Sequence, residues 1–221
     1  MSKLLSPLSV LLVAFLTVSS AAAQGLTADV AAGEKKIAMC LGCHGIEGYR
    51  SSFPEIYRVP MISGQGAGYI VSALTAYKAG HRKHPTMRGI AIGLSEQDIV
   101  DLSAYYEASG KAPGARVRAS VADDSAPAIE LVRRGACVAC HGVTFNKPLD
   151  PSYPKLAGQH ADYLFAALKA YKTNTNSSWG RDNPVMAGVV QQFSNAELKE
   201  LAEYVSSLPT ELRTTPQSGF K

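Results

Sequence analysis

Cys40-Leu41-Gly42-Cys43-His44 and Cys137-Val138-Ala139-Cys140-His141 are two copies of one pentapeptide, Cys-x-x-Cys-His. This spacing is the attachment signature of a c-type haem: the two thiols bond to one porphyrin, and the histidine that follows lies beneath its iron. The two copies contain every cysteine of the chain. Two zinc or redox Cys-x-x-Cys pairs are the competing interpretation, but they leave both histidines unexplained. We therefore predict two covalently attached haem c groups, with Cys40, Cys43, His44, Cys137, Cys140 and His141 as their binding residues.

The first residues have the pattern of an export signal. Lys3 is the only charge before Asp29, and an apolar run from 8 to 18 is followed by small residues that end at Ala23. The run is short for a membrane span, so we expect a signal peptide over 1–23, with a retained anchor as the alternative. No later segment is long and apolar enough to cross a bilayer. Haem attachment after export is typical of the bacterial periplasm, which is the expected location.

The charge of the chain does not indicate a nucleic-acid partner. The formal net charge of the 221 residues is +4, and removal of Lys3 takes it to +3. The propionates of two haems would bring the mature protein close to neutrality. Binding of nucleic acid requires a clustered basic face, which this balance does not support.

The two motifs belong to a longer internal repeat. Pro-Lys-Leu-Ala-Gly-Gln at 154–159 corresponds to Pro-Met-Ile-Ser-Gly-Gln at 60–65. The offset between the copies is 97 residues at the first cysteine, 94 at Tyr77 and Tyr171, and 99 at Met87 and Met186. Length changes confined to polar loops are typical of a duplicated domain. We predict an N-terminal domain over 24–112, a linker over 113–125 and a C-terminal domain over 126–221.

Apolar residues at helical spacing predict an all-α fold. Helices over 27–39 and 128–136 should lead into the two haem motifs, and the segments 69–77 and 163–171 should form a second matched pair. Ser95 and Ser194 are expected to begin the last helix of each copy, with Asp98 and Glu197 completing capping boxes. Because a domain of roughly ninety residues has a small core, we expect the porphyrin to supply much of it and the haem-free protein to fold poorly.

Met87 and Met186 are the predicted sixth ligands of the two irons. Each follows a proline by two residues, and each precedes its matching tyrosine by eighteen. Methionine is a common second axial ligand in cytochromes c and raises their potential. Core packing is the ordinary role of methionine, but the matched position after a haem motif favours ligation. Met39 lies beside the proximal cysteine, and Met61 has no methionine at its equivalent position.

Two histidines compete with Met87 for the first iron. His84, and behind it His81, lie just before Met87, but neither has an equivalent in the second copy, where Asn183 precedes the proline. Bis-histidine ligation of the first haem is therefore the alternative. We expect Pro60 and Pro154 to accept a hydrogen bond from the ligating histidines. Arg82 and the tyrosines at 69, 77, 163 and 171 should face propionates or pack between helices, while Arg181 is matched too weakly to assign.

These residues resemble a known family, the dihaem cytochrome c4 proteins. The resemblance covers essentially the whole mature chain and rests on both Cys-x-x-Cys-His-Gly motifs, on 154–159, on Ala-Tyr-Lys at 76–78 and 170–172, and on the Pro-x-Met segments. It implies two tandem class I cytochrome c domains related by internal duplication, and electron transfer in the periplasm, often directed to respiratory oxidases. The loop from Glu47 to Arg58 is longer and more basic and aromatic than the family pattern. Met61 and Ser63 also differ from the residues at the equivalent positions of the second copy. These departures leave the identity of the redox partner undetermined.

The combined features predict an electron carrier rather than an enzyme, with His44, Met87, His141 and Met186 as metal ligands. A dihaem peroxidase needs an iron with an open site, which two matched methionines would close. A cytochrome subunit of a dehydrogenase, for instance a flavoprotein that oxidises sulfide, would use the same haem chemistry and stays an alternative. A gas sensor would require displacement of a methionine. The expected partners are redox proteins, either a respiratory oxidase or a dehydrogenase, with or without a membrane anchor.

Overall fold

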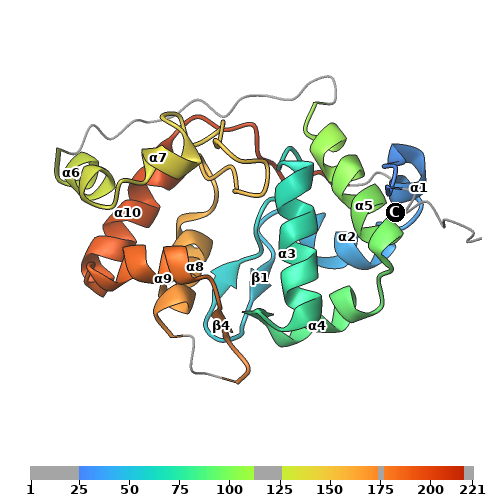
Figure 1. Ribbon diagram of the computed structural model, residues 1–221, viewed down its shortest axis with the longest axis horizontal. Coiled ribbons are helices and arrows are strands. Elements are labelled where there is room, and N and C mark those ends of the chain that lie inside the picture. Colours follow the sequence, from blue (N-terminus) through green and yellow to red (C-terminus); the bar gives the residue numbers. More distant parts are fainter. Residues whose placement is uncertain (1–24, 112–125, 174–176, 217–221) are drawn as a thin grey trace, which may run out of the picture.

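The two copies of the repeat fold into two groups of helices that lie side by side (Figure 1). The structure, a computed structural model, describes residues 25–111, 126–173 and 177–216. The N-terminal group contains α1 (Val30–Glu34), α2 (Ala38–His44), α3 (Ala67–Ala79), α4 (Pro85–Ile92) and α5 (Glu96–Ser109). The C-terminal group contains α6 (Ala126–Arg134), α7 (Val138–His141), α8 (Ala161–Lys172), α9 (Pro184–Gln191) and α10 (Asn195–Ser207). The prediction of an all-α fold with paired helices is confirmed.

Four strands of two residues each accompany the helices in the described part of the chain. β1 (Arg50–Ser51) and β2 (Tyr57–Arg58) form an antiparallel hairpin inside the segment that we expected to be irregular. β3 (Arg82–Lys83) pairs with β4 (Gly180–Arg181), so this second ladder joins the two groups. The predicted signal peptide and linker lie outside the described residues. Within the described residues, no helix has the length and apolar character of a membrane span.

The helix predicted over 27–39 is interrupted, which corrects that expectation. α1 ends at Glu34, and a turn over 35–37 separates it from α2. The turn places the ammonium group of Lys36 2.7 Å from Asp98 and 2.8 Å from Asp101, both on α5. An equivalent turn over 135–137 separates α6 from α7, so the helix predicted over 128–136 is interrupted as well.

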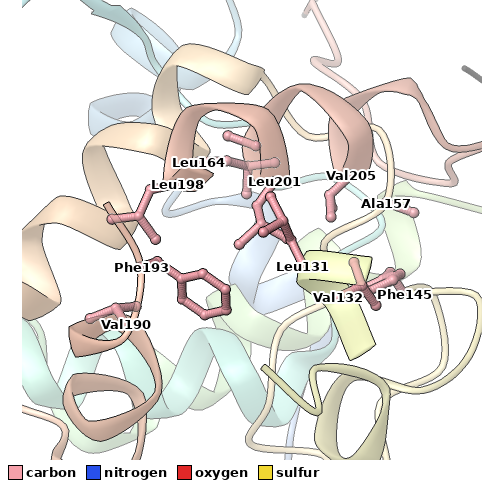
Figure 2. Packing of buried hydrophobic residues seen from close by; sticks show 11 residues of the cluster. Leu131, Val132, Phe145, Ala157, Leu164, Val190, Phe193, Leu198, Leu201 and Val205 are labelled. Carbon is pink, nitrogen blue, oxygen red and sulfur yellow. The ribbon is translucent and has the colours of Figure 1, made fainter. Parts of the chain in front are cut away.

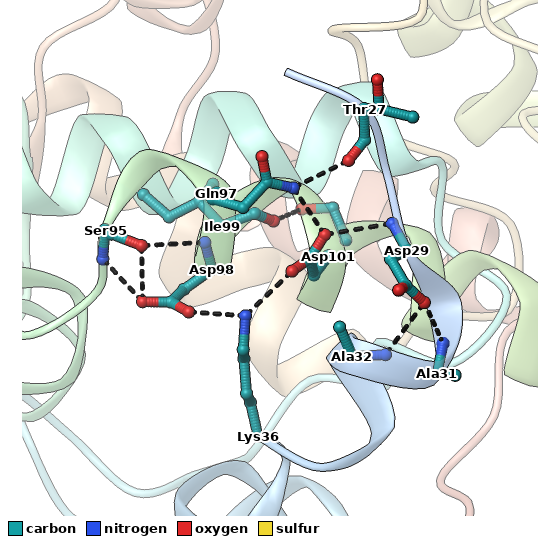
Figure 3. A network of polar contacts seen from close by, with 11 residues as sticks. Thr27, Asp29, Ala31, Ala32, Lys36, Ser95, Gln97, Asp98, Ile99 and Asp101 are labelled. Atoms are coloured by element: carbon teal, nitrogen blue, oxygen red, sulfur yellow. Dashed lines mark hydrogen bonds and ion pairs between the residues drawn. The ribbon is translucent and has the colours of Figure 1, made fainter.

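Asp101 is the centre of a polar network that ties α1 to α5 (Figure 3). Its side chain is almost fully buried and accepts hydrogen bonds from the Asp29 amide at 3.0 Å, from Lys36 and from Gln97 at 2.7 Å. The bond from Lys36, followed by those from Gln97 and the Asp29 amide, lowers the pKa of the Asp101 carboxyl. The network holds the N-terminal end of the first group in place.

Both predicted capping boxes are confirmed. The Ser95 hydroxyl accepts from the Asp98 amide at 3.1 Å, and the Asp98 carboxylate accepts from the Ser95 amide at 2.9 Å. Ser194 and Glu197 make the same reciprocal pair at 3.2 and 2.7 Å. These bonds satisfy amide groups that a helix N-terminus otherwise leaves without partners, so α5 and α10 begin at equivalent positions.

Each group has its own hydrophobic core. The core of the C-terminal group lies between α6, α8, α9 and α10 (Figure 2), with Leu198 fully buried and Phe193 nearly so. Cys137 and Met186 both pack against this core. In the N-terminal group, Cys40 packs against a cluster that includes Leu102 of α5. The cores therefore place a haem-motif cysteine beside the helix packing of each group.

Polar contacts join the two groups along their shared face. Arg58 donates to Asp162 at 3.0 Å, and Lys169 forms an ion pair with Glu55 at 2.6 Å. The segment after α10 returns to the N-terminal group, where the Arg213 amide donates to the Ser63 carbonyl at 3.1 Å. Arg58, at the end of the loop from Glu47, thus lies against the C-terminal group.

Candidate haem sites

Short helices carry the two haem motifs. α2 contains both Cys40 and Cys43 and ends at His44. In the second copy, Cys137 is the N-cap of α7, which ends at His141. All four cysteines are half-buried and none forms a disulfide. Helical spacing separates the two thiols of each motif by about one turn, so both can reach one face of a single porphyrin.

Hydrogen bonds to proline carbonyls orient both histidines, as predicted. Nδ1 of His44 lies 2.9 Å from the Pro60 oxygen, and Nδ1 of His141 lies 3.3 Å from the Pro154 oxygen. A carbonyl oxygen can only accept, so Nδ1 carries the proton and Nε2 keeps a free lone pair. Burial lowers the pKa of both imidazoles, against the opposing effect of these hydrogen bonds. Each ring is therefore a neutral donor of the kind that binds iron.

The two candidate methionines occupy the same place in equivalent helices. α4 begins with Pro85 and α9 begins with Pro184, and each methionine is the third residue of its helix. Proline suits a first helical position because its missing N–H needs no partner there. Met87 and Met186 are both half-buried. The structure thus repeats one helix start at both methionines.

The competing histidines have other roles in this structure. His84 is the N-cap of α4, and its Nδ1 accepts from the Met87 amide at 3.4 Å. Asn183 caps α9 in the same way, accepting from the Met186 amide at 2.9 Å. A histidine and an asparagine therefore serve one capping function. His81 is exposed and lies 3.3 Å from Asp182 of the other group. His84 therefore caps a helix through Nδ1, and His81 faces the other group.

A cluster of two arginines and several tyrosines lies where the groups meet. The ladder of β3 and β4 sets Arg82 opposite Arg181. Tyr163 accepts from both guanidinium groups, at 2.8 Å from Arg82 and 3.0 Å from Arg181. Each arginine also reaches a tyrosine of its own group: Arg82 donates to Tyr69 at 2.9 Å and Arg181 to Tyr171 at 3.4 Å. Tyr163 of the C-terminal group is therefore shared by the two arginines.

This cluster has the charge pattern of an anion site. Burial acts to raise the pKa of Tyr163, but the two guanidinium groups outweigh it and lower that pKa. The Nε atom of Arg82 is buried and has no hydrogen-bond partner among the described residues. Buried charges normally pair with groups of opposite sign, and the partners that we see here are neutral hydroxyls. Haem propionates would supply the missing carboxylates, so the residues present fit haem.

Sequence reasoning missed Arg181 as a member of this cluster. Its offset from Arg82 is 99 residues, which is the same offset that relates Met87 to Met186. That offset was the available signal. The tyrosines at 69, 77, 163 and 171 lie beside the two arginines. This position is compatible with both roles considered for them, which are facing propionates and packing between helices.

Comparison with known proteins places these features in a family. The cytochrome c family profile matches residues 126–209. Cytochrome c4 of Pseudomonas aeruginosa is 32% identical over 187 residues, which cover 81% of this chain and 89% of that protein. The thiosulfate dehydrogenase electron acceptor of Stutzerimonas stutzeri is 30% identical over 210 residues, covering 91% of this chain and 94% of its own.

Solved structures show the same likeness. Reduced recombinant cytochrome c4 from Pseudomonas stutzeri superposes with a TM-score of 0.58 at 27% identity, covering 82% of this chain and all of that one. Cytochrome c4 of Acidithiobacillus ferrooxidans gives a TM-score of 0.60 at 25% identity, covering 78% and 99%. The predictions of two covalently bound haem c groups and of a dihaem class I cytochrome fold are confirmed.

Proposed function

The chain belongs to the cytochrome c4 family of dihaem electron-transfer proteins, and from this premise we propose that it is a periplasmic electron shuttle whose irons each have one histidine and one methionine ligand. The first iron would be bound by His44 and Met87, and the second by His141 and Met186. The observation that carries the proposal is the repeated geometry: a proton-donating Nδ1 on each histidine, and one capped Pro-x-Met helix start in each group.

The residues around each haem would hold its ligands still. When bound, each haem supplies a one-electron ferrous–ferric couple. The proline carbonyls fix the histidine rings, the N-caps fix α4 and α9, and the paired arginines neutralise charge between the groups. Little rearrangement is then needed when an electron arrives or leaves. Two closed irons offer no coordination site to a substrate, which supports a carrier rather than a dihaem peroxidase.

The periplasm is the proposed location because the first residues have the pattern of an export signal and all four cysteines are used for haem attachment. Respiratory-chain proteins are the proposed partners. A role as the electron acceptor of a dehydrogenase is the second candidate, and it is favoured by one finding: relatives named thiosulfate dehydrogenase electron acceptors match over more than four-fifths of this chain. A solved thiosulfate dehydrogenase from Marichromatium purpuratum also matches, with 31% identity and a TM-score of 0.58, although this chain covers only 36% of it.

Spectroscopy of the oxidised holoprotein tests the ligation. Both irons should contribute to the weak near-infrared band of methionine bound to ferric haem. Met87→Ala and Met186→Ala should each remove one half of that band and lower the potential of one haem only. Met39→Ala, an exposed methionine on the proximal side, is the matched control and should leave the band intact. A band of full strength in either ligand variant would refute the assignment.

Reduction kinetics separate the two candidate partners. In one experiment, the oxidised holoprotein is mixed with thiosulfate dehydrogenase and thiosulfate. In a parallel experiment, the reduced holoprotein is mixed with a membrane preparation that contains a respiratory oxidase. Rapid reduction by the dehydrogenase would support the acceptor role. Rapid oxidation by the membranes without reduction by the dehydrogenase would support delivery to an oxidase.

A further inference from the structure

Two buried glutamines reach across the interface between the groups. Gln159 accepts from the Met61 amide at 3.1 Å and donates to the Met61 carbonyl at 2.9 Å. Gln65 makes the mirror-image pair with Lys155, at 2.8 and 2.9 Å. The two glutamines are only 3% and 4% exposed. Each side-chain amide therefore binds both backbone polar groups of one residue in the opposite group, away from water.

The orientation of each glutamine amide is determined by its neighbours. Oε1 of Gln159 accepts a second bond, from the His160 amide at 3.0 Å, and Oε1 of Gln65 accepts one from the Gly66 amide at 3.0 Å. Two N–H donors thus meet each oxygen, which a nitrogen in that place could not accept. Gly66 and His160 are the N-caps of α3 and α8, so each glutamine is also held by the start of its own helix.

Each clamped amide belongs to the peptide group that orients a haem histidine. The peptide bond between Pro60 and Met61 carries the oxygen that accepts from His44 and the N–H that donates to Gln159. In the second copy, the peptide bond after Pro154 links His141 to Gln65 in the same way. A continuous chain of hydrogen bonds therefore runs from each histidine to the glutamine of the opposite group.

Hydrogen bonds at the two ends of one peptide group strengthen each other. When a glutamine oxygen accepts from the N–H, more negative charge collects on the carbonyl oxygen. That oxygen then accepts more strongly from the histidine Nδ1–H. A stronger bond at Nδ1 makes the imidazole a more basic ligand, and a more basic ligand favours ferric over ferrous iron. The glutamine should therefore lower the reduction potential of the haem in the other group.

We propose that Gln159 and Gln65 are positioning residues that set the ligand strength of His44 and of His141, each acting on the haem of the opposite group. The contact between the groups is then part of how the two potentials are set. The inference rests on the proposed function, because it assumes that both histidines ligate iron. A glutamine that only held the groups together would have no reason to affect one haem and spare the other.

The test is a spectroscopic redox titration of the holoprotein, with the two haems first assigned from Met87→Ala and Met186→Ala. Gln159→Leu should raise the potential of the first haem and leave the second unchanged. Gln65→Leu should do the reverse. Gln192→Leu, which removes an exposed side-chain amide outside this chain of bonds, is the control and should shift neither. Equal shifts of both haems, or a shift of the haem in the variant's own group, would overturn the proposal.

Gln159→Glu distinguishes an effect of the hydrogen bond from the Met61 amide from an effect of loosened packing between the groups. Its carboxylate oxygen still accepts from the Met61 amide, and more strongly than the neutral amide does, while the bond that Gln159 donates to the Met61 carbonyl is lost. The stronger acceptor at the amide should make the first potential fall instead of rise. If the leucine variant does not fold, this variant decides alone: a fall confined to the first haem supports the proposal. A rise like that of Gln159→Leu, or no shift, contradicts it, because loosened packing would act alike in both variants.

A second measurement does not depend on the potentials. In proton NMR spectra of the reduced protein, the His44 Nδ1–H resonance should move upfield in Gln159→Leu, while the His141 resonance stays in place. The near-infrared methionine band is recorded on the same samples. If that band is normal and neither resonance nor potential moves, the glutamine proposal fails while the ligation stands. If the wild type lacks the band, the ligation itself fails.

Discussion

Gly33→Ala should destabilise the N-terminal group, because α1 and α5 touch at this glycine. A Cβ atom at Gly33 would lie 2.2 Å from the backbone oxygen of Asp101 and 2.9 Å from Cβ of Tyr105, whereas ordinary contacts begin at 3.4 Å. α1 would have to retreat by about 1 Å to restore van der Waals distances. That movement also stretches the bond from the Asp29 amide to Asp101, which is 3.0 Å long.

The expected net effect follows from two opposing terms. Overpacking of this kind costs about 1–3 kcal/mol, and alanine recovers about 0.5–1 kcal/mol over glycine in a helix. Gly33→Ala should therefore lower the free energy of unfolding by about 1–2 kcal/mol. For a domain of this size, such a loss corresponds to a fall in Tm of very roughly 5–10 °C.

Gly42→Ala is a matched control from the other side of the same turn. Gly42 lies in α2, and a Cβ there would meet nothing within 4 Å. The second copy already has Ala139 at this position of its haem motif. This substitution should be neutral or stabilise the protein by up to about 1 kcal/mol. The assay is guanidinium unfolding of holoprotein followed by circular dichroism and Soret absorbance. Equal midpoints for the two variants would refute the contact argument.

Three further results are expected. Asp101→Asn should flatten the pH dependence of the unfolding free energy in acid, because Lys36 depresses the pKa of Asp101. The stability from this pair is complete above the pKa of the unfolded state, about 3.9, and is lost as the pH falls through the lower pKa of the folded state. Denaturation midpoints between neutral pH and pH ~3 would measure this. Leu198→Ala should cost about 2–5 kcal/mol because the side chain is fully buried, whereas the exposed Ile129→Ala should change stability by less than about 0.5 kcal/mol; calorimetry of both variants checks the difference. Arg181→Gln should lower at least one reduction potential, since loss of a buried positive charge favours the ferric state; unchanged potentials would place the propionates elsewhere.

Local signals were sufficient for much of this protein. The Cys-x-x-Cys-His motifs specify haem attachment because the chemistry requires that spacing, and no contact from elsewhere in the chain alters it. The capping boxes at Ser95 and Ser194 were likewise readable, because a helix start is satisfied by side chains within three residues. The proline carbonyls could be named in advance because both copies place a proline five residues before the matched glutamine of the repeat.

Other features depend on contacts that no local pattern contains. The ion pairs of Lys36, in the turn before α2, join it to carboxylates more than sixty residues away in sequence. The β3–β4 ladder and the shared Tyr163 exist only because the two groups pack with their equivalent faces together. Arg58, at the end of the loop that departs from the family pattern, is bound to Asp162 of the other group.

The sequence by itself determined the two covalent haems and the helical class, and it contains the histidines and methionines that we propose as iron ligands, because each of these follows from residue type and short spacing or from the register of the repeat. Only the tertiary structure decided how the two copies face each other. Packing at that face buries Arg82, whose Nε has no hydrogen-bond partner among the described residues, and brings Gln65 and Gln159 onto the peptide groups behind the opposite histidines. Hydrogen bonds over such separations depend on packing, and packing is a property of the whole chain.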